Sequence, residues 1–318
     1  SGQRNVILIT LDGMRWQDVF RGADLTIIND KKYTSDSAFV MNNFWSENAT
    51  ERRAKLFPFL WSTVATKGQI YGNRDLGSKV NVTNQMWFSY PGYNELLTGA
   101  SNDSAIFSND AIDNPRKTVL ELLNDQQAYK GGIAAFTSWD AFPGIINSNR
   151  SGLLVNSGIA PYQTEKLSEK QQLLNEMITE LPYLGSTRPD AITFNLGFEY
   201  LKLNQPSVLF MSFDETDHFA HSGDYALYLK SARHTDQMIS SLWNWLQSQD
   251  KYRDNTTLII TVDHGRGDAA EGMWQHHGIK VPGADQIWFA IIGPDTAPLG
   301  ERKQDEQLYQ NQIAQTSN

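Results

Sequence analysis

The chain of 318 residues contains no cysteine. This absence excludes disulfide bonds, thiolate catalysis and zinc sites built on cysteine ligands. Long apolar runs are also missing, because the longest ones, residues 6–11 and 258–262, fall far short of the roughly 20 residues that a membrane-spanning helix needs. We therefore expect no membrane span.

Basic residues are in deficit: 27 Lys and Arg stand against 36 Asp and Glu, which gives a formal charge of −9 and a pI near 5.2. Without a basic stripe, we do not expect a nucleic-acid polymer as partner. A small anionic ester remains an acceptable substrate, because a bound metal ion outweighs a diffuse negative field. With 40 % hydrophobic and 20 % charged residues, the composition is that of an ordinary folded protein.

Continuous apolar runs predict the strands of the fold. Residues 5–11 are apolar up to Asp12-Gly13, which is typical of a strand buried on both faces. Similar runs occupy residues 132–136, 207–213, 257–262 and 286–292.

Helical patterns lie between these runs, at residues 118–127 and along an apolar stripe over residues 225–246. The alternation predicts right-handed βαβ units, hence an α/β fold with a doubly wound, mostly parallel central sheet and helices on both faces. We interpret residues 1–318 as one domain. Residues 21–60 and 140–205 fit the alternation poorly, and we expect them to be cap insertions.

The histidines indicate where the chemistry lies, because all six fall between positions 218 and 277. Asp263-His264-Gly265 directly follows the run 257–262, so a carboxylate and an imidazole stand at the carboxyl end of a strand, where ligands bind in such sheets. The structural alternative is a helix cap beside a histidine with ordinary hydrogen bonds.

Two further segments offer competing ligands. After the run 207–213, both Asp214/His218 and Asp217/His221 have the four-residue spacing that puts two side chains on one helix face. In the turn that ends at Gly278, His276 competes with His277. Polar groups this dense after a buried strand are costly unless something binds them.

Asp12 ends the first strand at the same sheet edge, so four segments can contribute to one metal centre. The converging ligands are Asp12, Asp217 with His221, Asp263 with His264, and His277. Mixed nitrogen and oxygen donors suit Zn²⁺ or Mn²⁺ rather than Ca²⁺ or Mg²⁺ alone. The number of ligands favours two ions over one.

The segment around Ser89 supplies a nucleophile. Pro91 can open a helix directly after Ser89, which would put the hydroxyl at the positive end of the helix, where a metal-bound serine is competent to attack phosphorus. The structural alternative is a simple N-cap. Trp87, Tyr90 and Tyr93 either stack on a base or aryl group or pack the core.

These motifs resemble the alkaline phosphatase superfamily over most of the chain. Asp12-Gly13-Met14-Arg15 and the run from Ser89-Tyr90-Pro91 to Thr98-Gly99 are similar to the nucleotide pyrophosphatase/phosphodiesterase branch. The run 216–223 resembles a ligand loop of cofactor-independent phosphoglycerate mutases, and Asp263-His264-Gly265 and His277-Gly278 complete the order. In formylglycine sulfatases an Arg follows the nucleophile, and this chain lacks it, which argues against an ordinary sulfatase.

The resemblance implies a role for each site residue. One metal would be held by Asp12, Ser89, Asp263 and His264, and the second by Asp217, His221 and His277. We favour Asp217/His221 and His277 over Asp214/His218 and His276, because Ser222-Gly223 and Gly278 continue the family pattern. Asn109 would hold a phosphate oxygen, and Arg15 or Arg266 would neutralise substrate charge.

Our leading hypothesis is a metal-dependent hydrolase of phosphate esters, a phosphodiesterase or phosphatase, that acts through a phosphoserine at a dinuclear zinc or manganese site. The alternatives are a sulfatase-like or phosphonate hydrolase, a phosphoryl-group transferase of the same superfamily, or a binding protein that has lost its chemistry. The chain starts at Ser1 without Met, so we expect that an upstream segment was removed and that the enzyme is periplasmic or secreted. Neither the oligomeric state nor the physiological substrate follows from the sequence.

Overall fold

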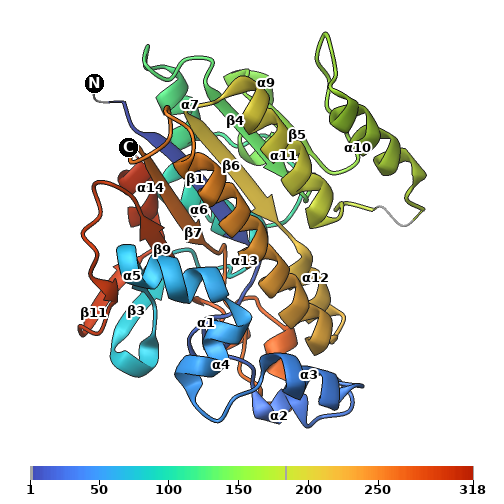
Figure 1. Cartoon of the computed structure of the whole chain (residues 1–318), viewed down its shortest axis with the longest axis vertical. Coiled ribbons are helices and arrows are strands. Elements are labelled where there is room, and N and C mark those ends of the chain that lie inside the picture. Colours follow the sequence, from blue (N-terminus) through green and yellow to red (C-terminus); the bar gives the residue numbers. More distant parts are fainter. Residues whose placement is uncertain (1–2, 183–184, 318) are drawn as a thin grey trace.

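The computed structural model describes residues 3–182 and 185–317. Its centre is a large sheet in which β1, β4, β5, β6 and β7 run parallel and β9 is antiparallel to β7 (Figure 1). The strands of this sheet are, in spatial order, β10 (Gly300–Glu301), β2 (Gln69–Tyr71), β9 (Phe289–Ile292), β7 (Thr256–Thr261), β1 (Asn5–Leu11), β6 (Val208–Phe213), β4 (Ile133–Thr137) and β5 (Leu154–Ser157). The predicted α/β fold with a mostly parallel central sheet is therefore confirmed.

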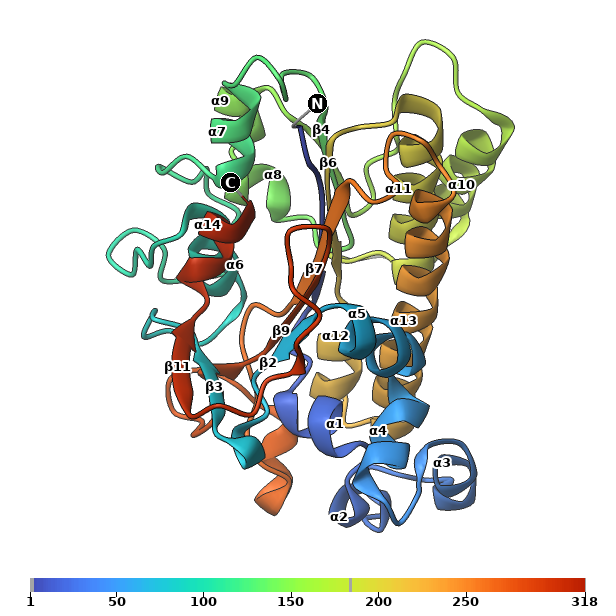
Figure 2. The same cartoon turned by 60° about the vertical axis from the view of Figure 1, so that its left-hand side comes forward.

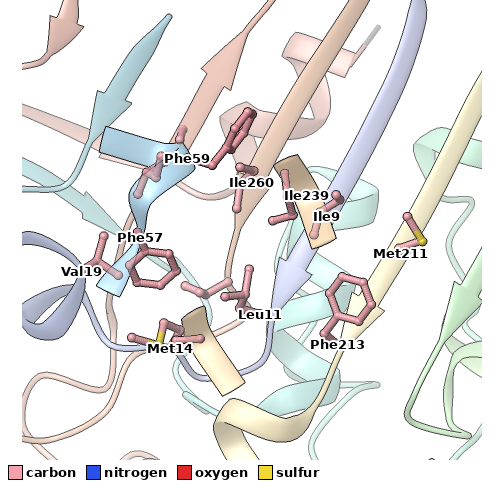
Figure 3. Close-up of a cluster of buried hydrophobic side chains, with 14 of the residues drawn as sticks. Ile9, Leu11, Met14, Val19, Phe57, Phe59, Met211, Phe213, Ile239 and Ile260 are labelled. Atoms are coloured by element: carbon pink, nitrogen blue, oxygen red, sulfur yellow. The ribbon is translucent and has the colours of Figure 1, made fainter. Parts of the chain in front are cut away.

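β1 shows why an unbroken apolar run forms the central strand. Ile7, Ile9 and Leu11 belong to the core on one face of the sheet, whereas Val6 and Leu8 belong to the core on the other. Since successive side chains of a strand point to opposite faces, burial on both faces requires apolar residues at every position. Figure 3 shows Ile9 and Leu11 packed with side chains of β6, β7 and a covering helix.

Helices cover both faces of the sheet (Figure 2). The first layer consists of α10 (Glu169–Glu180), α11 (Asp190–Asn204) and α13 (Tyr225–Gln247). The second layer consists of α6 (Ser89–Thr98), α7 (Val119–Asn124), α8 (Phe142–Ile145), α9 (Ser148–Ser151) and α14 (Asn311–Ser317). The predicted helices at residues 118–127 and 225–246 correspond to α7 and α13.

The predicted strand at residues 286–292 is divided in the structure. β8 (Gln286–Ile287) pairs with β3 (Ser78–Asn81) in a small sheet completed by β11 (Glu306–Tyr309), whereas β9 continues in the large sheet. Trp288 stands between the two strands, and its fully buried indole donates to the carbonyl of Met14 at 3.0 Å. One apolar run thus joins two sheets.

Short helices fill the end of the molecule beyond the carboxyl ends of the parallel strands, as Figure 1 shows for α1 to α4 and α12. They are α1 (Trp16–Arg21), α2 (Leu25–Ile28), α3 (Ser37–Phe44), α4 (Ala49–Leu56), α12 (Glu215–His221), and the 3₁₀ helices η2 (Arg74–Leu76) and η3 (Ala270–Gln275). Residues 21–60 belong largely to this group. The π-helix η1 (Leu60–Val64) packs on β9, and α5 (Ala65–Lys67) leads into β2.

Residues 140–205, which we expected to form a cap insertion, contribute to the central sheet and to one helix layer. Their β5 is an edge strand of the large sheet, and α11 packs on β4 and β6, so the described part of this segment completes the sheet and one helix layer. None of the helices in residues 3–182 and 185–317 combines the length and apolar character that crossing a bilayer demands.

Candidate metal centre

Three neighbouring parallel strands deliver acidic residues to one edge of the sheet. The register aligns Leu11 of β1 with Phe213 of β6, and Thr10 of β1 with Thr261 of β7. The segments that leave these strands therefore start side by side and carry Asp12, the helix α12 and Asp263. The predicted convergence follows from the parallel pairing.

Asp217, His221 and His277 form one group whose ligand atoms all lie within 4.8 Å of one another. Asp217 Oδ1 is 3.2 Å from His221 Nε2 and 3.7 Å from His277 Nε2, and the two Nε2 atoms are 3.0 Å apart. The other ring nitrogen of His277, Nδ1, is 3.0 Å from the carbonyl oxygen of Trp87. That second contact orients the ring so that Nε2 faces the carboxylate.

Asp12, Asp217 and His264 form a second group of the same size. His264 Nε2 lies 3.3 Å from Asp12 Oδ1 and 3.3 Å from Asp263 Oδ2. The His264 ring stacks on the His277 ring with centroids 3.8 Å apart, so the two groups adjoin. Asp217 is common to both.

Three of these buried polar atoms have no hydrogen-bond partner within the described part of the chain: Asp12 Oδ1, Asp263 Oδ2 and His264 Nε2. Buried polar groups are almost always paired, because each unpaired one costs about 1–3 kcal/mol. Three that point at the same place are explained by a bound cation. The donor set of carboxylate oxygens and imidazole nitrogens therefore fits divalent metal ions.

The pKa values point the same way. Burial, and then the charge of Asp217, raise the pKa of Asp12 well above its ordinary value. Burial and the charge of Asp12 raise the pKa of Asp263 likewise. Burial also lowers the pKa of His277 to about 2, so its imidazole is neutral and free to bind metal at any working pH. A cation that replaces the protons on these carboxyls is favoured.

Ser89 is the first residue of α6, is buried, and its hydroxyl makes a long contact of 3.5 Å to Asp12 Oδ2. The residue before it, Phe88, occupies the N-cap position, and no side chain caps the helix. The alternative role of Ser89 as an N-cap is therefore not what the structure shows. Its hydroxyl faces the metal ligands instead.

Glycines permit this close approach. Gly92 packs against the backbone of Asp263, and a Cβ at this position would clash with the Asp263 carbonyl. Gly13 has a φ of +57°, and a Cβ there would lie 2.8 Å from His264 Cε1. Larger residues at either position would push Ser89 or Asp12 away from the ligands.

The hydroxyl of Tyr93 contacts a candidate metal ligand, a contact that the sequence analysis did not predict. This hydroxyl donates to Asp12 Oδ2 at 2.8 Å and accepts from Ser212 Oγ at 3.3 Å. Tyr90 and Tyr93 are fully buried in the core, so they do not stack on a substrate. The spacing held a usable signal, because Tyr93 lies four residues after Ser89 and shares its helix face.

A cavity of about 600 Å³ opens beside Ser89. Its wall includes Asn109 and both competing pairs, Asp214/His218 and Asp217/His221. Asp217 and His221 belong to the ligand groups found among the described residues, whereas Asp214 and His218 do not. Asn109 Oδ1 accepts from the backbone N–H of Tyr90 at 3.0 Å, which fixes the side chain next to Ser89. His276, the competitor of His277, is exposed and outside both groups.

The two arginines have different surroundings. Arg266 is buried and donates to Asp217 Oδ1 at 2.6 Å. Burial pushes the pKa of Asp217 upward, but Arg266 and His221 outweigh it and hold that pKa well below its ordinary value. Arg15 is also fully buried, yet its guanidinium donates to Asp18 at 2.6 and 3.1 Å and to the carbonyl of Gly267. The structure thus gives Arg15 a structural ion pair in place of the predicted contact with substrate.

Solved structures share this fold at low sequence identity. An alkaline phosphatase PafA variant matches with a TM-score of 0.62 and 11 % identity over 98 % of this chain and 95 % of that one. The lipoteichoic acid synthase LtaP from Listeria monocytogenes matches with a TM-score of 0.62 and 12 % identity over 99 % and 71 %. The 2-O GAG sulfatase BT1596 gives 0.54 and 12 % over 98 % and 68 %. No curated protein matches the sequence.

The model of one protein family, "Type I phosphodiesterase / nucleotide pyrophosphatase", matches residues 25–281. The matched range contains Ser89, Asn109 and all members of the two ligand groups except Asp12, which lies before it. The family supports hydrolase activity on phosphate esters. The chain belongs to the type I phosphodiesterase / nucleotide pyrophosphatase family, and its fold is shared with alkaline phosphatase-like structures.

Proposed function

We propose that this protein is a metal-dependent phosphodiesterase that uses Ser89 as nucleophile at a dinuclear site. The observation that carries the proposal is the position of the Ser89 hydroxyl, 3.5 Å from Asp12 Oδ2 of one ligand group and in the wall of a cavity that Asp217 and His221 of the other group also line. Asp12, Asp263 and His264 would hold one divalent ion, and Asp217, His221 and His277 the other. Mixed donors of this kind suit Zn²⁺ or Mn²⁺.

The two ions, when bound, supply the positive charge that lowers the pKa of a serine hydroxyl and offsets the charge of the phosphoryl group. The side chains of the protein carry out the bond-forming steps. Ser89 Oγ attacks phosphorus, the bond to the leaving alcohol breaks, and a phosphoserine forms. Water then attacks phosphorus, the bond to Ser89 Oγ breaks, and the hydroxyl is restored.

Three side chains support this reaction. Tyr93 holds the Asp12 carboxylate by its hydrogen bond to Oδ2, which leaves Oδ1 facing His264. Arg266 fixes Asp217 at the meeting point of both groups. Asn109, whose Oδ1 is bound by the Tyr90 N–H, has an amide group available to donate to a phosphate oxygen.

The cavity indicates which phosphate esters fit. Its wall includes the carboxylates of Asp110, Asp140 and Asp214, and no Lys or Arg among the described residues. Away from the proposed ions, additional phosphate groups in this cavity would meet these carboxylates without a Lys or Arg to offset them. We therefore favour diesters with an uncharged or cationic alcohol over pyrophosphates. The 4-nitrophenyl ester of dTMP should be hydrolysed with a higher kcat/KM than ATP, and the reverse order would contradict this preference.

The nucleophile is tested by Ser89→Ala. We expect turnover of bis(4-nitrophenyl) phosphate to fall by at least about 10³-fold while two equivalents of metal remain bound, as measured by elemental mass spectrometry. Acid quench of the unaltered protein during turnover should trap a phosphorylated peptide that contains Ser89. Ser104→Ala, an exposed serine on the following loop, serves as matched control and should keep full activity.

Four other experimental outcomes would contradict the proposal or favour an alternative function. Turnover retained in Ser89→Ala would refute the serine mechanism. Faster hydrolysis of 4-nitrophenyl sulfate than of either phosphate ester would favour a sulfatase-like enzyme. Transfer of the phosphoryl group to an added alcohol, in place of hydrolysis, would favour a transferase. Protein that binds no metal even after reconstitution would exclude the dinuclear site.

A further inference from the structure

The helix α12 carries two metal ligands, Asp217 and His221, but it has no cap of its own. Asp214 stands at its N-cap position without a capping hydrogen bond from its side chain. The carboxylate of Asp190, the first residue of α11, takes this role from a distant part of the chain. Asp190 Oδ1 accepts from Asp214 N at 2.9 Å and Oδ2 accepts from Glu215 N at 3.1 Å.

The capping is reciprocal. α11 begins after Pro189, which offers no capping side chain either. The backbone N–H of Asp190 donates instead to Glu215 Oε2 at 2.5 Å. The first residues of α11 and α12 therefore cap each other's helix, and orphan N–H groups at both ends gain charged acceptors.

Asp190 is itself firmly held. It is 4 % exposed, and Ser138, which follows β4, donates its hydroxyl to Asp190 Oδ1 at 2.7 Å. Ser138 Oγ also lies 2.8 Å from Thr193 Oγ1, one turn further along α11. The carboxylate thus connects α12 to α11 and to the end of a central strand.

The position of α12 depends on such contacts. A helix of 7 residues has little stability alone, since isolated helices shorter than about 12 residues are marginal in water. Its ligands must also meet His277, which comes from a different segment. A small shift of α12 would separate Asp217 and His221 from their partner.

We propose that Asp190 is a positioning residue that sets α12, and through it Asp217 and His221, in register with His277 for metal binding. The inference rests on the proposed function for the role of that ligand group. The other group shares Asp217 but takes Asp12, Asp263 and His264 from the ends of β1 and β7. Loss of the Asp190 carboxylate should therefore weaken the ion held by Asp217, His221 and His277 more than the other ion.

The test compares Asp190→Asn with Asp236→Asn. Asp236 on α13 is a matched control, because its buried carboxylate also accepts two backbone N–H groups, from Phe59 at 2.7 Å and Leu60 at 3.0 Å, but neither belongs to the metal centre. Zn²⁺ affinities of metal-free protein are measured by competition with a chromophoric chelator. Partners behind metal ligands typically change affinity 10–100-fold, so we expect one site of Asp190→Asn to weaken by about that factor.

The possible results distinguish a failure of the inference about Asp190 from a failure of the proposed function. Two unchanged Zn²⁺ affinities in Asp190→Asn, or equal losses in both variants, would overturn the inference. If the unaltered protein binds no Zn²⁺, the proposed function fails. Asp190 is then judged by amide hydrogen exchange of residues 215–221, which must be faster in Asp190→Asn than in Asp236→Asn. If Asp190→Asn does not fold, Ser138→Ala, which removes one hydrogen bond to Asp190, should weaken the same site to a smaller extent.

Discussion

Replacement of Tyr93 by phenylalanine tests whether the core of the protein holds the metal ligands in place. The substitution removes one oxygen atom and leaves the ring, which packs edge-to-face on Phe142 with centroids 4.7 Å apart. Asp12 Oδ2 then loses a hydrogen bond of 2.8 Å inside the core. Ser212 Oγ loses its acceptor at 3.3 Å.

The magnitude follows from the charge of the acceptor. A hydrogen bond to an ionised group is worth about 1.5–3 kcal/mol, against about 0.5–1.5 kcal/mol for a neutral pair. Unfolding entropy of about 2.1 cal/mol/K per residue over 318 residues means that 1 kcal/mol shifts Tm by roughly 1.5 °C. We expect Tyr93→Phe to lower Tm of the metal-loaded protein by about 2–4 °C.

Tyr90→Phe is the matched control. Tyr90 lies on the same helix, is equally buried, and its hydroxyl donates to the neutral carbonyl of Ile112 at 2.7 Å. We expect a smaller drop in Tm, and no change in metal affinity, because Tyr90 does not contact a ligand through its side chain. Tyr93→Phe should weaken the ion held by Asp12 about 10-fold or more, as measured by chelator competition. Equal behaviour of the two variants in both measurements would refute the reasoning.

Three further predictions concern charge and protonation. Arg266→Met leaves the Asp217 side chain, which is 15 % exposed, without the Arg266 cation and should destabilise metal-free protein by up to about 3 kcal/mol in urea unfolding, and a loss below about 1 kcal/mol would contradict this. His277→Ala should lose one equivalent of bound metal and His276→Ala none, as elemental analysis will show, and the opposite result would reverse the ligand assignment. Burial raises the pKa of Asp236 to about 7, so the folded state binds this proton more tightly than the unfolded state. The stabilising contribution of the protonated carboxyl is present below the ordinary pKa of about 4 and is lost as pH rises toward 7. The Tm of the unaltered protein, measured relative to Asp236→Asn, should therefore fall between pH 4 and 7. A rise of this Tm difference over the same range would contradict the raised pKa.

The sequence alone correctly predicted those helices and strands whose burial requires a regular pattern of apolar residues. β1 occupies the predicted residues 5–11, and α13 covers the predicted apolar stripe, because a strand with two buried faces and a long amphipathic helix each leave an unmistakable pattern. The predicted sheet followed from their alternation. The prediction of one strand over residues 286–292 was wrong, because an apolar run does not indicate where the chain passes from one sheet to another.

Part of the candidate site could also be predicted from the sequence, because the buried strands that precede it have a clear pattern. Asp12 and Asp263 come directly after strands, and the parallel pairing of those strands places both residues at one edge of the sheet. Tyr93 was not recognised, because a buried aromatic residue that packs the core and one that also holds a carboxylate have the same pattern. Only the distance of its hydroxyl from Asp12 distinguishes them.

The sequence by itself determined which chemical groups stand beyond the strands, because the chain order and the buried runs fix them. Only the tertiary structure shows which of the two pairs lies within ligand distance of a third residue, since both pairs have the spacing of one helical turn. Asp217 and His221 form a group with His277, because α12 is rotated so that both face it. Thr216 donates its hydroxyl to the carbonyl of Asp12 at 2.6 Å, and this contact between residues far apart in the chain holds α12 against the end of β1, where Asp217 also joins the group of Asp12 and His264.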